Sequence, residues 1–127
     1  MKIQILPLVT GAQKATGLTV IIDVFRAFSL EAYMYASGAK KVIPVKTVED
    51  ALALKKENPS YILVGERKGI KVEGFDYGNS PSEFVGVDLS GKTLIHTTSA
   101  GILGLASAVN ASQIVTGALV NAKATAK

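Results

Sequence analysis

A near-continuous run of β-branched and apolar residues from Leu18 to Val24 constrains the fold of this chain more than any other feature. Such a run is typical of a strand that is buried on both faces, as in parallel sheets. Helix-like segments follow at Ala27–Ser37 and Val48–Glu57, with further strand-like runs between and after them. This alternation predicts an α/β fold: a layered α/β/α sandwich with a mostly parallel or mixed sheet.

The other predicted elements are short and extend along the whole chain. Gly38 is placed to end the first helix, and Thr47 to cap the second, with Asp50 in the position of a capping-box acid. The segment 66–90 is too rich in Gly, Asp, Asn, Ser and Pro to supply a core element, apart from one helical turn at Ser82–Val85. We expect strands at Lys2–Leu6, Lys41–Lys46, Tyr61–Gly65, Lys92–Thr97 and Gln113–Gly117, and helices over Ala100–Val109 and from Leu119 onward.

The composition fits a single domain, 1–127, and excludes several classes of protein. With 127 residues, 48% of them hydrophobic and 19% charged, the chain can bury a core and is not disordered. The absence of cysteine excludes a disulfide scaffold, a Cys-ligated metal site and a Cys nucleophile, and the single histidine, His96, excludes a His-rich metal site. No apolar run approaches the ~18 residues of a membrane span, and the N-terminus lacks signal-peptide features, so we expect a soluble, cytoplasmic protein.

The formal charge of +4 at pH 7 leaves two interpretations open. The excess of basic residues is compatible with solubility alone or with an anionic partner. The lysines are scattered and do not alternate with aromatic residues, so no stacking surface for nucleic acid is indicated. We therefore expect a small anionic substrate and no nucleic-acid or membrane partner.

Polar side chains follow three of the predicted strands, at the edge of the sheet where open α/β folds bind their ligands. Asp23 ends an apolar run, where a bare carboxylate is costly to bury. It either caps a helix or pairs with Arg26, or it faces a ligand. The full set is Asp23 and Arg26 after the first of these strands, Glu66 and Arg67 after the second, and Thr97, Thr98 and Ser99 at the third.

The hydroxyl cluster and the long loop each have two interpretations as well. Three hydroxyls at 97–99 beside the free N–H groups of a helix start suit an anion, although an ordinary N-cap uses only one of them. The loop 65–81 concentrates carboxylates, basic side chains and glycines, and it is either a solvated surface loop or an ordered functional one. Its carboxylates suit Mg²⁺, whereas Arg26 and Arg67 suit phosphate or sulfonate oxygens.

Several well-known catalytic and nucleotide-binding motifs are missing. There is no G-x-G-x-x-G after a strand and no Walker A loop, which argues against folds that bind nucleotides in those ways. No G-x-S-x-G elbow lies near His96, and we expect this histidine to be a packed strand residue. A metal-free hydrolase or transferase is a weaker alternative, because no nucleophile is evidently paired with a base.

Five stretches of the chain together resemble the family of 2-phosphosulfolactate phosphatases of coenzyme M biosynthesis. They occur in the family's order and cover most of the chain, and the block Phe-Asp-x-Gly-Asn-Ser-Pro is the most specific of them. The stretches are 20–27 (VIIDVFRA), 38–45 (Gly-Ala followed by Val-Ile-Pro-Val), 65–69 (GERKG), 74–81 (GFDYGNSP) and 97–101 (TTSAG).

This resemblance implies a Mg²⁺-dependent phosphatase with an α/β fold, which hydrolyses the phosphate ester of 2-phosphosulfolactate or of a related small phosphorylated hydroxy acid. The resemblance marks the signature positions, and we assign their roles on chemical grounds. A covalent phosphoaspartate at Asp23 stays open, although Phe25 breaks the Asp-x-Asp pattern. We expect Asp23, Arg26, Glu66 and Arg67 to be catalytic, with the arginines binding phosphate or sulfonate; Asp23, Glu66 and Asp76 to hold Mg²⁺ or position water; and Asn79, Ser80, Thr97, Thr98 and Ser99 to line the anion site.

The chain departs from the family in two ways. Ile102 stands where another threonine is expected, and family members are about twice as long. The resemblance therefore implies that 1–127 is the N-terminal half of a longer fold, with the other half completing the active site. A truncated, non-catalytic anion-binding or assembly module is the alternative. Strand edges left open by a missing half favour a homo-oligomer.

Overall fold

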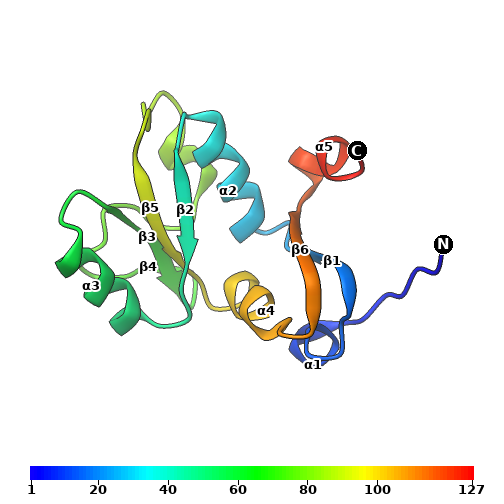
Figure 1. The fold of residues 1–127 in the computed structure, drawn as a ribbon. Coiled ribbons are helices and arrows are strands. Elements are labelled where there is room, and N and C mark those ends of the chain that lie inside the picture. The colour runs from blue at the N-terminus through cyan, green and yellow to red at the C-terminus, as the bar shows by residue number, and fades with distance from the viewer.

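Two sheets carry the strands of this computed structural model, which describes all 127 residues. The larger sheet has the order β2-β5-β3-β4, in which β2, β5 and β3 are parallel and β4 is antiparallel to β3. The smaller sheet pairs β1 with β6 in parallel (Figure 1). The strands are β1 (Gly17–Ile22), β2 (Lys41–Pro44), β3 (Ile62–Arg67), β4 (Ile70–Lys71), β5 (Thr93–Thr97) and β6 (Ala111–Gly117).

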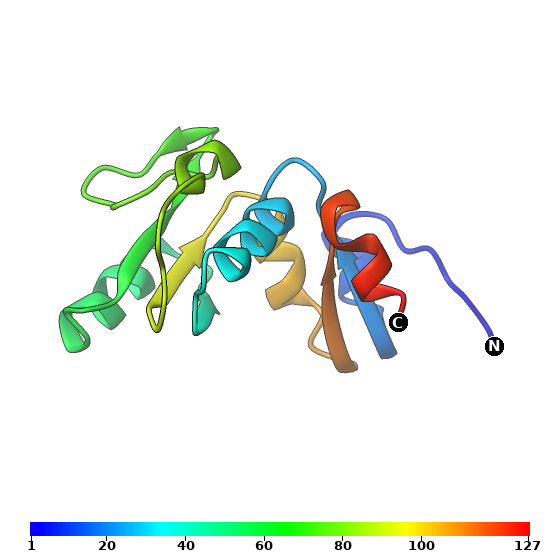
Figure 2. The same cartoon turned by 90° about the horizontal axis from the view of Figure 1, so that it is seen from above.

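Helices cover both faces of the larger sheet and separate it from the smaller one. α3 (Val48–Glu57) packs on one face of the larger sheet, and α2 (Ala27–Ala36) packs on the other. α2 and α4 (Gly101–Ser107) lie between the two sheets (Figures 1 and 2). The short α1 (Leu8–Ala12) packs against α4, and α5 (Ala122–Thr125) against β6. The predicted α/β architecture, with parallel and mixed sheets packed against helices, is confirmed.

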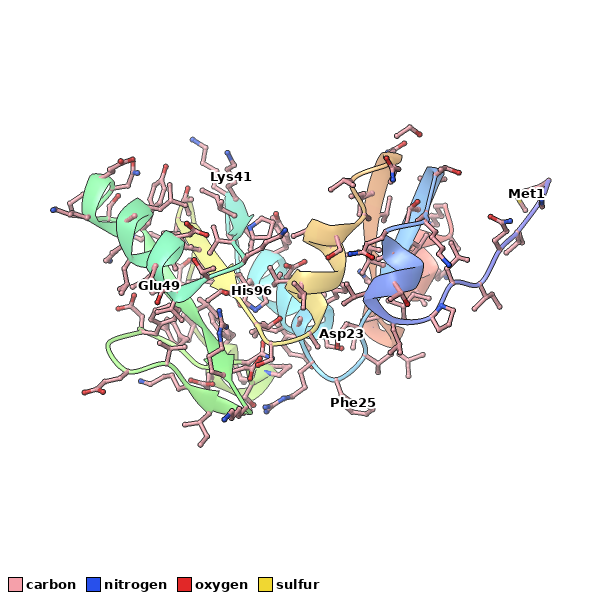
Figure 3. All side chains as sticks on the ribbon, turned by 90° about the horizontal axis from the view of Figure 1, so that it is seen from below. Met1, Asp23, Phe25, Lys41, Glu49 and His96 are labelled. Atoms are coloured by element: carbon pink, nitrogen blue, oxygen red, sulfur yellow. The ribbon has the colours of Figure 1, made fainter.

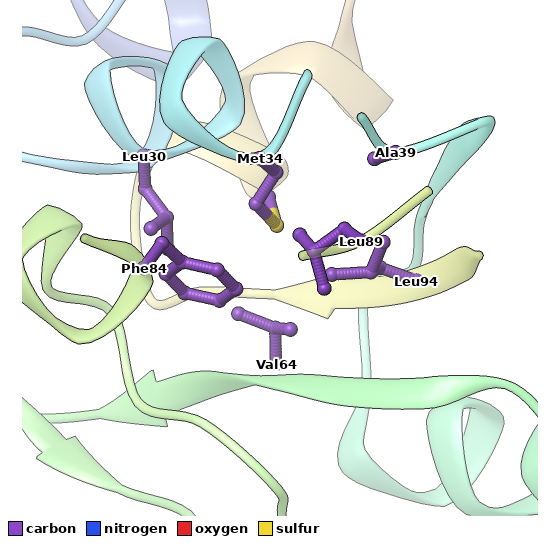
Figure 4. Close-up of a cluster of buried hydrophobic side chains, with 7 residues drawn as sticks. All are labelled: Leu30, Met34, Ala39, Val64, Phe84, Leu89 and Leu94. Atoms are coloured by element: carbon purple, nitrogen blue, oxygen red, sulfur yellow. The ribbon is translucent and has the colours of Figure 1, made fainter. Parts of the chain in front are cut away.

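Alternate residues of β3 and β5 face the two helical layers. Leu63 and Ile95 pack with Ala51 of α3 on one face. The adjacent residues Val64 and Leu94 belong to the main hydrophobic cluster under α2 on the other face (Figure 4). This follows from the twofold alternation of side chains along a strand. β3 and β5 are therefore buried on both faces, as strands of a parallel sheet are.

The segment 66–90 supplies more of the core than its polar composition predicts. Phe75, Phe84 and Leu89 are at most 4% exposed, and the ring centroids of Tyr77 and Phe84 are 4.5 Å apart. The 3-10 turn η1 (Pro81–Phe84), close to the predicted helical turn, positions Phe84. The prediction that this segment supplies no core element was wrong, because a few widely spaced apolar side chains anchor an otherwise polar loop.

Two predictions for the N-terminal part of the chain were also wrong. Residues 2–6 form no strand and remain exposed, since no neighbouring strand is there to satisfy their backbone groups (Figure 2). β1 forms as predicted but is not buried on both faces: Leu18, Val20 and Ile22 are 67%, 43% and 72% exposed. Its sheet has only two strands, and on its other face Ile21 packs against the cluster between α2 and α4.

The helix ends follow the local chemistry of the sequence. The hydroxyl of Thr47 accepts the N–H of Asp50 at 3.0 Å at the start of α3, as predicted. Gly38, with φ of +98°, follows the end of α2 in a conformation that favours glycine. The last residues form a 3-10 turn, η2 (Leu119–Asn121), and the single turn of α5. None of the helices has the length and apolar character needed to cross a membrane.

Candidate functional site

Glu66, near the end of β3, ties this strand to the segment that follows β5. One carboxylate oxygen accepts the N–H of Ser99 at 2.6 Å, and the other accepts the Ser99 hydroxyl at 3.0 Å and the N–H of Gly69 at 2.7 Å. Burial by itself raises the pKa of Glu66, but these hydrogen bonds and the charge of Arg67 outweigh it and hold the pKa below its ordinary value. Glu66 is therefore a fixed, ionised group that joins two strand ends.

Arg67 links the ends of all three parallel strands. Its guanidinium donates to the hydroxyl of Thr97 at 2.8 Å, to the carbonyl of Lys46 beyond β2 at 3.1 Å, and to the carbonyl of Glu66 at 2.7 Å. Three of its five N–H donors are thus used within the chain, which leaves two for a ligand. Arg67 is a positioned cation at the edge of the sheet where the sequence predicts ligand binding.

The three hydroxyls of 97–99 have different partners. Thr97 is fully buried and accepts from Arg67, whereas Thr98 accepts the N–H of Ile102 at 3.2 Å inside α4. Ser99 is exposed, and its hydroxyl accepts the N–H of Lys68 at 3.2 Å while donating to Glu66. Thr98 thus binds a free N–H in the first turn of α4, whose N-cap is Ala100, and Ser99 is the exposed residue of the three.

Asp23 follows β1 and lies beside the first turns of both α2 and α4 (Figure 3). A Cβ on Gly101 would lie 2.5 Å from a carboxylate oxygen of Asp23, so only glycine permits this approach. Burial raises the pKa of Asp23, as do the charges of Glu66 and Glu31, against the opposing effects of the Ala27 backbone N–H and His96. Asp23 is a half-buried carboxylate whose surroundings disfavour its negative charge.

Arg26 does not pair with Asp23. No ion pair or hydrogen bond involves the Arg26 side chain, and the nearest basic and acidic side chains in the structure are His96 and Glu31, 3.2 Å apart. The sequence left two structural interpretations of Asp23, a salt bridge to Arg26 and a helix cap. The salt bridge is not formed, whereas the hydrogen bond from the Ala27 N–H resembles a helix cap. Arg26 is half-buried and keeps all its donors.

His96 belongs to a buried polar chain that the sequence analysis missed. Its Nδ1 lies 3.2 Å from Glu31 Oε1 and its Nε2 lies 3.3 Å from Asn79 Oδ1, and all three residues are buried. His96 is a packed strand residue as expected, but with two polar partners. The signal for Glu31 was its place as the one charge inside the otherwise apolar helix 27–36.

The remaining predicted site residues form hydrogen bonds with other partners than Glu66 and Asp23. Asp76 accepts the N–H of Leu63 at 2.8 Å, three residues before Glu66 on β3. The hydroxyl of Ser80 pairs with that of Ser82 at 2.8 Å. The structure therefore brings together Asp23, Glu66, Arg67 and 97–99, while Asp76 and Ser80 stabilise the loop 65–81 and Asn79 binds His96.

Comparison with known proteins supports the resemblance read from the motifs. The family model described as 2-phosphosulpholactate phosphatase matches residues 5–127. The chain belongs to this family. Each relative below is described as a probable 2-phosphosulfolactate phosphatase, and the chain spans about half the length of each. The protein of Carboxydothermus hydrogenoformans is 47% identical over 107 residues (84% of this chain, 44% of the relative), that of Clostridium tetani 46% over 109 (85% and 47%), and that of Bacillus subtilis 39% over 110 (87% and 48%).

The carboxylates of the site can supply only a few of the ligands of the Mg²⁺ that the family resemblance implies. No group of three or more histidine and acidic side chains is arranged as a metal site. Mg²⁺, however, is held by as few as one or two carboxylates together with waters and substrate oxygens. Asp23 fits, because a cation offsets the charge that its surroundings disfavour. Glu66 has one acceptor position left, and Asp76 is directed to the Leu63 N–H.

Proposed function

We propose that this chain carries part of the active site of a Mg²⁺-dependent phosphatase that hydrolyses the phosphate ester of 2-phosphosulfolactate, or of a related small phosphorylated hydroxy acid, to sulfolactate and phosphate. Family membership supports the reaction class. The observation that carries the proposal is the junction of Glu66, Arg67 and Ser99 at the strand ends, with Asp23 packed against Gly101, two residues after Ser99.

We assign a different role to each residue of the site according to its chemistry. Arg67, with two free donors, and Arg26, with all of its donors free, bind the phosphate and sulfonate oxygens of the substrate. Ser99 is exposed beside this site, but its N–H and hydroxyl both donate to Glu66, so the arginines supply the donors to the anion. Glu66 holds the loop and the strand ends in position.

Asp23 is the carboxylate that we assign to Mg²⁺ and to positioning the attacking water. When bound, Mg²⁺ supplies a positive charge that stabilises the transferring phosphoryl group. The Asp23 side chain is bound only by the Ala27 N–H and forms no ion pair, and it lies where α2 and α4 begin. Glu66 offers at most one further position, and the substrate completes the site from outside the chain.

A non-catalytic anion-binding or assembly module is the second candidate. It is favoured by the extent of the match, because the chain spans about half of each relative. It is also favoured by the hydroxyls of 97–99, all three of which are already engaged within the chain. This candidate binds phosphate or sulfonate but releases no product.

Phosphate release separates the two candidates. The 127-residue chain is joined to the other half of the Carboxydothermus relative and assayed with a panel of phosphorylated hydroxy acids that includes 2-phosphosulfolactate, with Mg²⁺ and with a chelator. We expect the joined chain to release phosphate, and the chelator to lower its rate by at least about 100-fold. A joined chain that is folded and binds the substrate but releases no phosphate supports the non-catalytic module instead.

A further inference from the structure

A cleft of about 350 Å³ separates the edges of the two sheets, between β2 and β6. Val42 and Pro44 of β2 form one wall, and Ile114, Val115 and Thr116 of β6 form the other. Each of these strands is paired on one side only, β2 with β5 and β6 with β1 (Figure 1). Two free strand edges therefore line this cleft.

The edge of β2 is protected against pairing with another strand. Val45 donates to the carbonyl of His96 at 3.0 Å, so the alternate positions Val42 and Pro44 face away from β5. Pro44 has no N–H to donate, and the N–H of Val42 donates to the hydroxyl of Tyr35 on α2 at 3.3 Å. A proline and a covering side chain are both ways in which edge strands avoid pairing.

The edge of β6 is open along its middle. Asp23 donates from its N–H to the carbonyl of Gly117 at 3.0 Å, so the alternate positions Ile114 and Thr116 face away from β1. The carbonyl of Thr116 accepts from the amide of Asn121 at 3.2 Å, which covers the end of this edge. The N–H and carbonyl of Ile114 and the N–H of Thr116 remain able to pair with an added strand.

An occupant of this cleft must be extended and partly apolar, because most of the lining side chains are hydrophobic. The relatives contain about as much chain outside the matched segment as within it. We propose that an extended segment from that other half of the family chain lies in the cleft, pairs with the free edge of β6, and packs its side chains against Val42, Pro44 and Leu105.

This pairing explains how the smaller sheet gains stability. A two-stranded sheet is marginal on its own, and β1 and β6 have no third strand within the chain. A second copy of the chain fits the cleft less well, because its own β6 edge is recessed beside β2 in the same way. The inference concerns assembly of the fold and does not depend on phosphatase activity.

The test mixes the 127-residue chain with the separately expressed other half of the Carboxydothermus relative and follows amide hydrogen exchange. We expect a one-to-one complex in which exchange at Ile114 and Thr116 slows by at least about tenfold. Where the other half does not fold alone, the same exchange measurement is made on a single polypeptide that joins it to this chain.

Two matched variants locate the contact. Ile114→Lys places a charge in the cleft, and Ile70→Lys places the same charge on β4, where Ile70 is 73% exposed at the far edge of the larger sheet. We expect Ile114→Lys to weaken the complex by at least about tenfold and Ile70→Lys to change it by less than about twofold. Circular dichroism confirms that each variant is folded.

Three results would overturn the proposal. One is a complex that leaves exchange at Ile114 and Thr116 unchanged, and another is the absence of a complex between two folded halves. The third is slower exchange at these two amides in the chain alone as its concentration rises, which assigns the cleft to a second copy.

Discussion

At the scale of single residues, Asp23 combines a candidate role in catalysis with a cost to stability. Its pKa is raised in the folded chain, chiefly by burial. A raised pKa means that the folded state binds the proton more tightly than the unfolded state does. The contribution of Asp23 to stability is therefore fully present below the unfolded pKa of about 3.9 and is lost as the pH rises through the folded value.

Asp23→Asn should therefore raise the melting temperature near pH 7, by roughly a few degrees, and the gain should disappear towards pH 3. The amide oxygen can still accept the N–H of Ala27, so the gain reflects the lost charge. Thermal unfolding followed by circular dichroism at several pH values measures it. Asp50→Asn, at an exposed position on α3, is the control and should show no such gain. A melting temperature that is unchanged or lower at pH 7 would contradict this interpretation.

His96 is the residue on which the buried polar chain depends. It is 0% exposed and lies between Glu31 and Asn79. His96→Ala leaves the carboxylate of Glu31 buried without its partner, which should cost roughly 3 kcal/mol of the free energy of unfolding. Urea denaturation measures this change, and the double variant with Glu31→Gln should recover part of the loss. Strictly additive losses would show that the two side chains do not interact.

At the scale of elements, Glu66 joins the end of β3 to the segment between β5 and α4. Glu66→Gln replaces one acceptor oxygen by an NH₂ group that faces the N–H of Ser99 or Gly69. We expect a loss of about 1–3 kcal/mol in the free energy of unfolding near pH 7. Glu73→Gln, exposed in the same loop, is the matched control and should have little effect.

The pH dependence of this loss has a definite sign. The pKa of Glu66 is lowered by folding, so its contribution to stability is present above the unfolded value of about 4.3 and is lost as the pH falls through the folded value. The difference between the wild-type chain and Glu66→Gln should therefore shrink in acid. Urea unfolding curves at pH 7 and near pH 3 measure it, and an equal difference at both would rule out this role for the carboxylate.

The elements with a local signal could be predicted from the sequence. The cap at Thr47, the stop at Gly38 and the buried runs of β3 and β5 depend on neighbouring residues, and all of them are found. The strand predicted at Lys2–Leu6 depended on a neighbour that the sequence could not reveal. The exposure of one face of β1 likewise depends on how the two sheets and the helices assemble.

The candidate site could be predicted in part for the same reason. Strand ends can be located from the sequence, and the residues at or after them come together in the fold. These residues are Asp23, Glu66, Arg67 and 97–99. His96 and Glu31 are 65 positions apart in the sequence, and their contact depends on how α2 packs over β5. No local sequence pattern therefore predicts it. Asp76 belongs to the motif at 74–81, but its carboxylate accepts the N–H of Leu63 near the start of β3. The position of Asp76 in the sequence does not predict this contact.

At the scale of the whole molecule, one face of the smaller sheet remains bare. Leu18, Val20 and Ile22 project from it, and apolar surface of this kind marks interaction sites. The expected homo-oligomer stays a prediction, and we expect the chain alone to self-associate through this face. Light scattering at high concentration should show Ile22→Lys to be more monomeric than the wild-type chain, with Ile70→Lys unchanged. A wild-type chain that remains monomeric would contradict the prediction.

The most direct test of the proposed function is phosphate release from 2-phosphosulfolactate by three forms of the chain joined to the other half of the Carboxydothermus relative: wild type, Asp23→Asn and Asp50→Asn. We predict release that requires Mg²⁺, falls by at least about 100-fold in Asp23→Asn and is unchanged in Asp50→Asn. Release that persists in the presence of a chelator, or an Asp23→Asn rate within about twofold of wild type, would contradict the assignment of Asp23 to the active site.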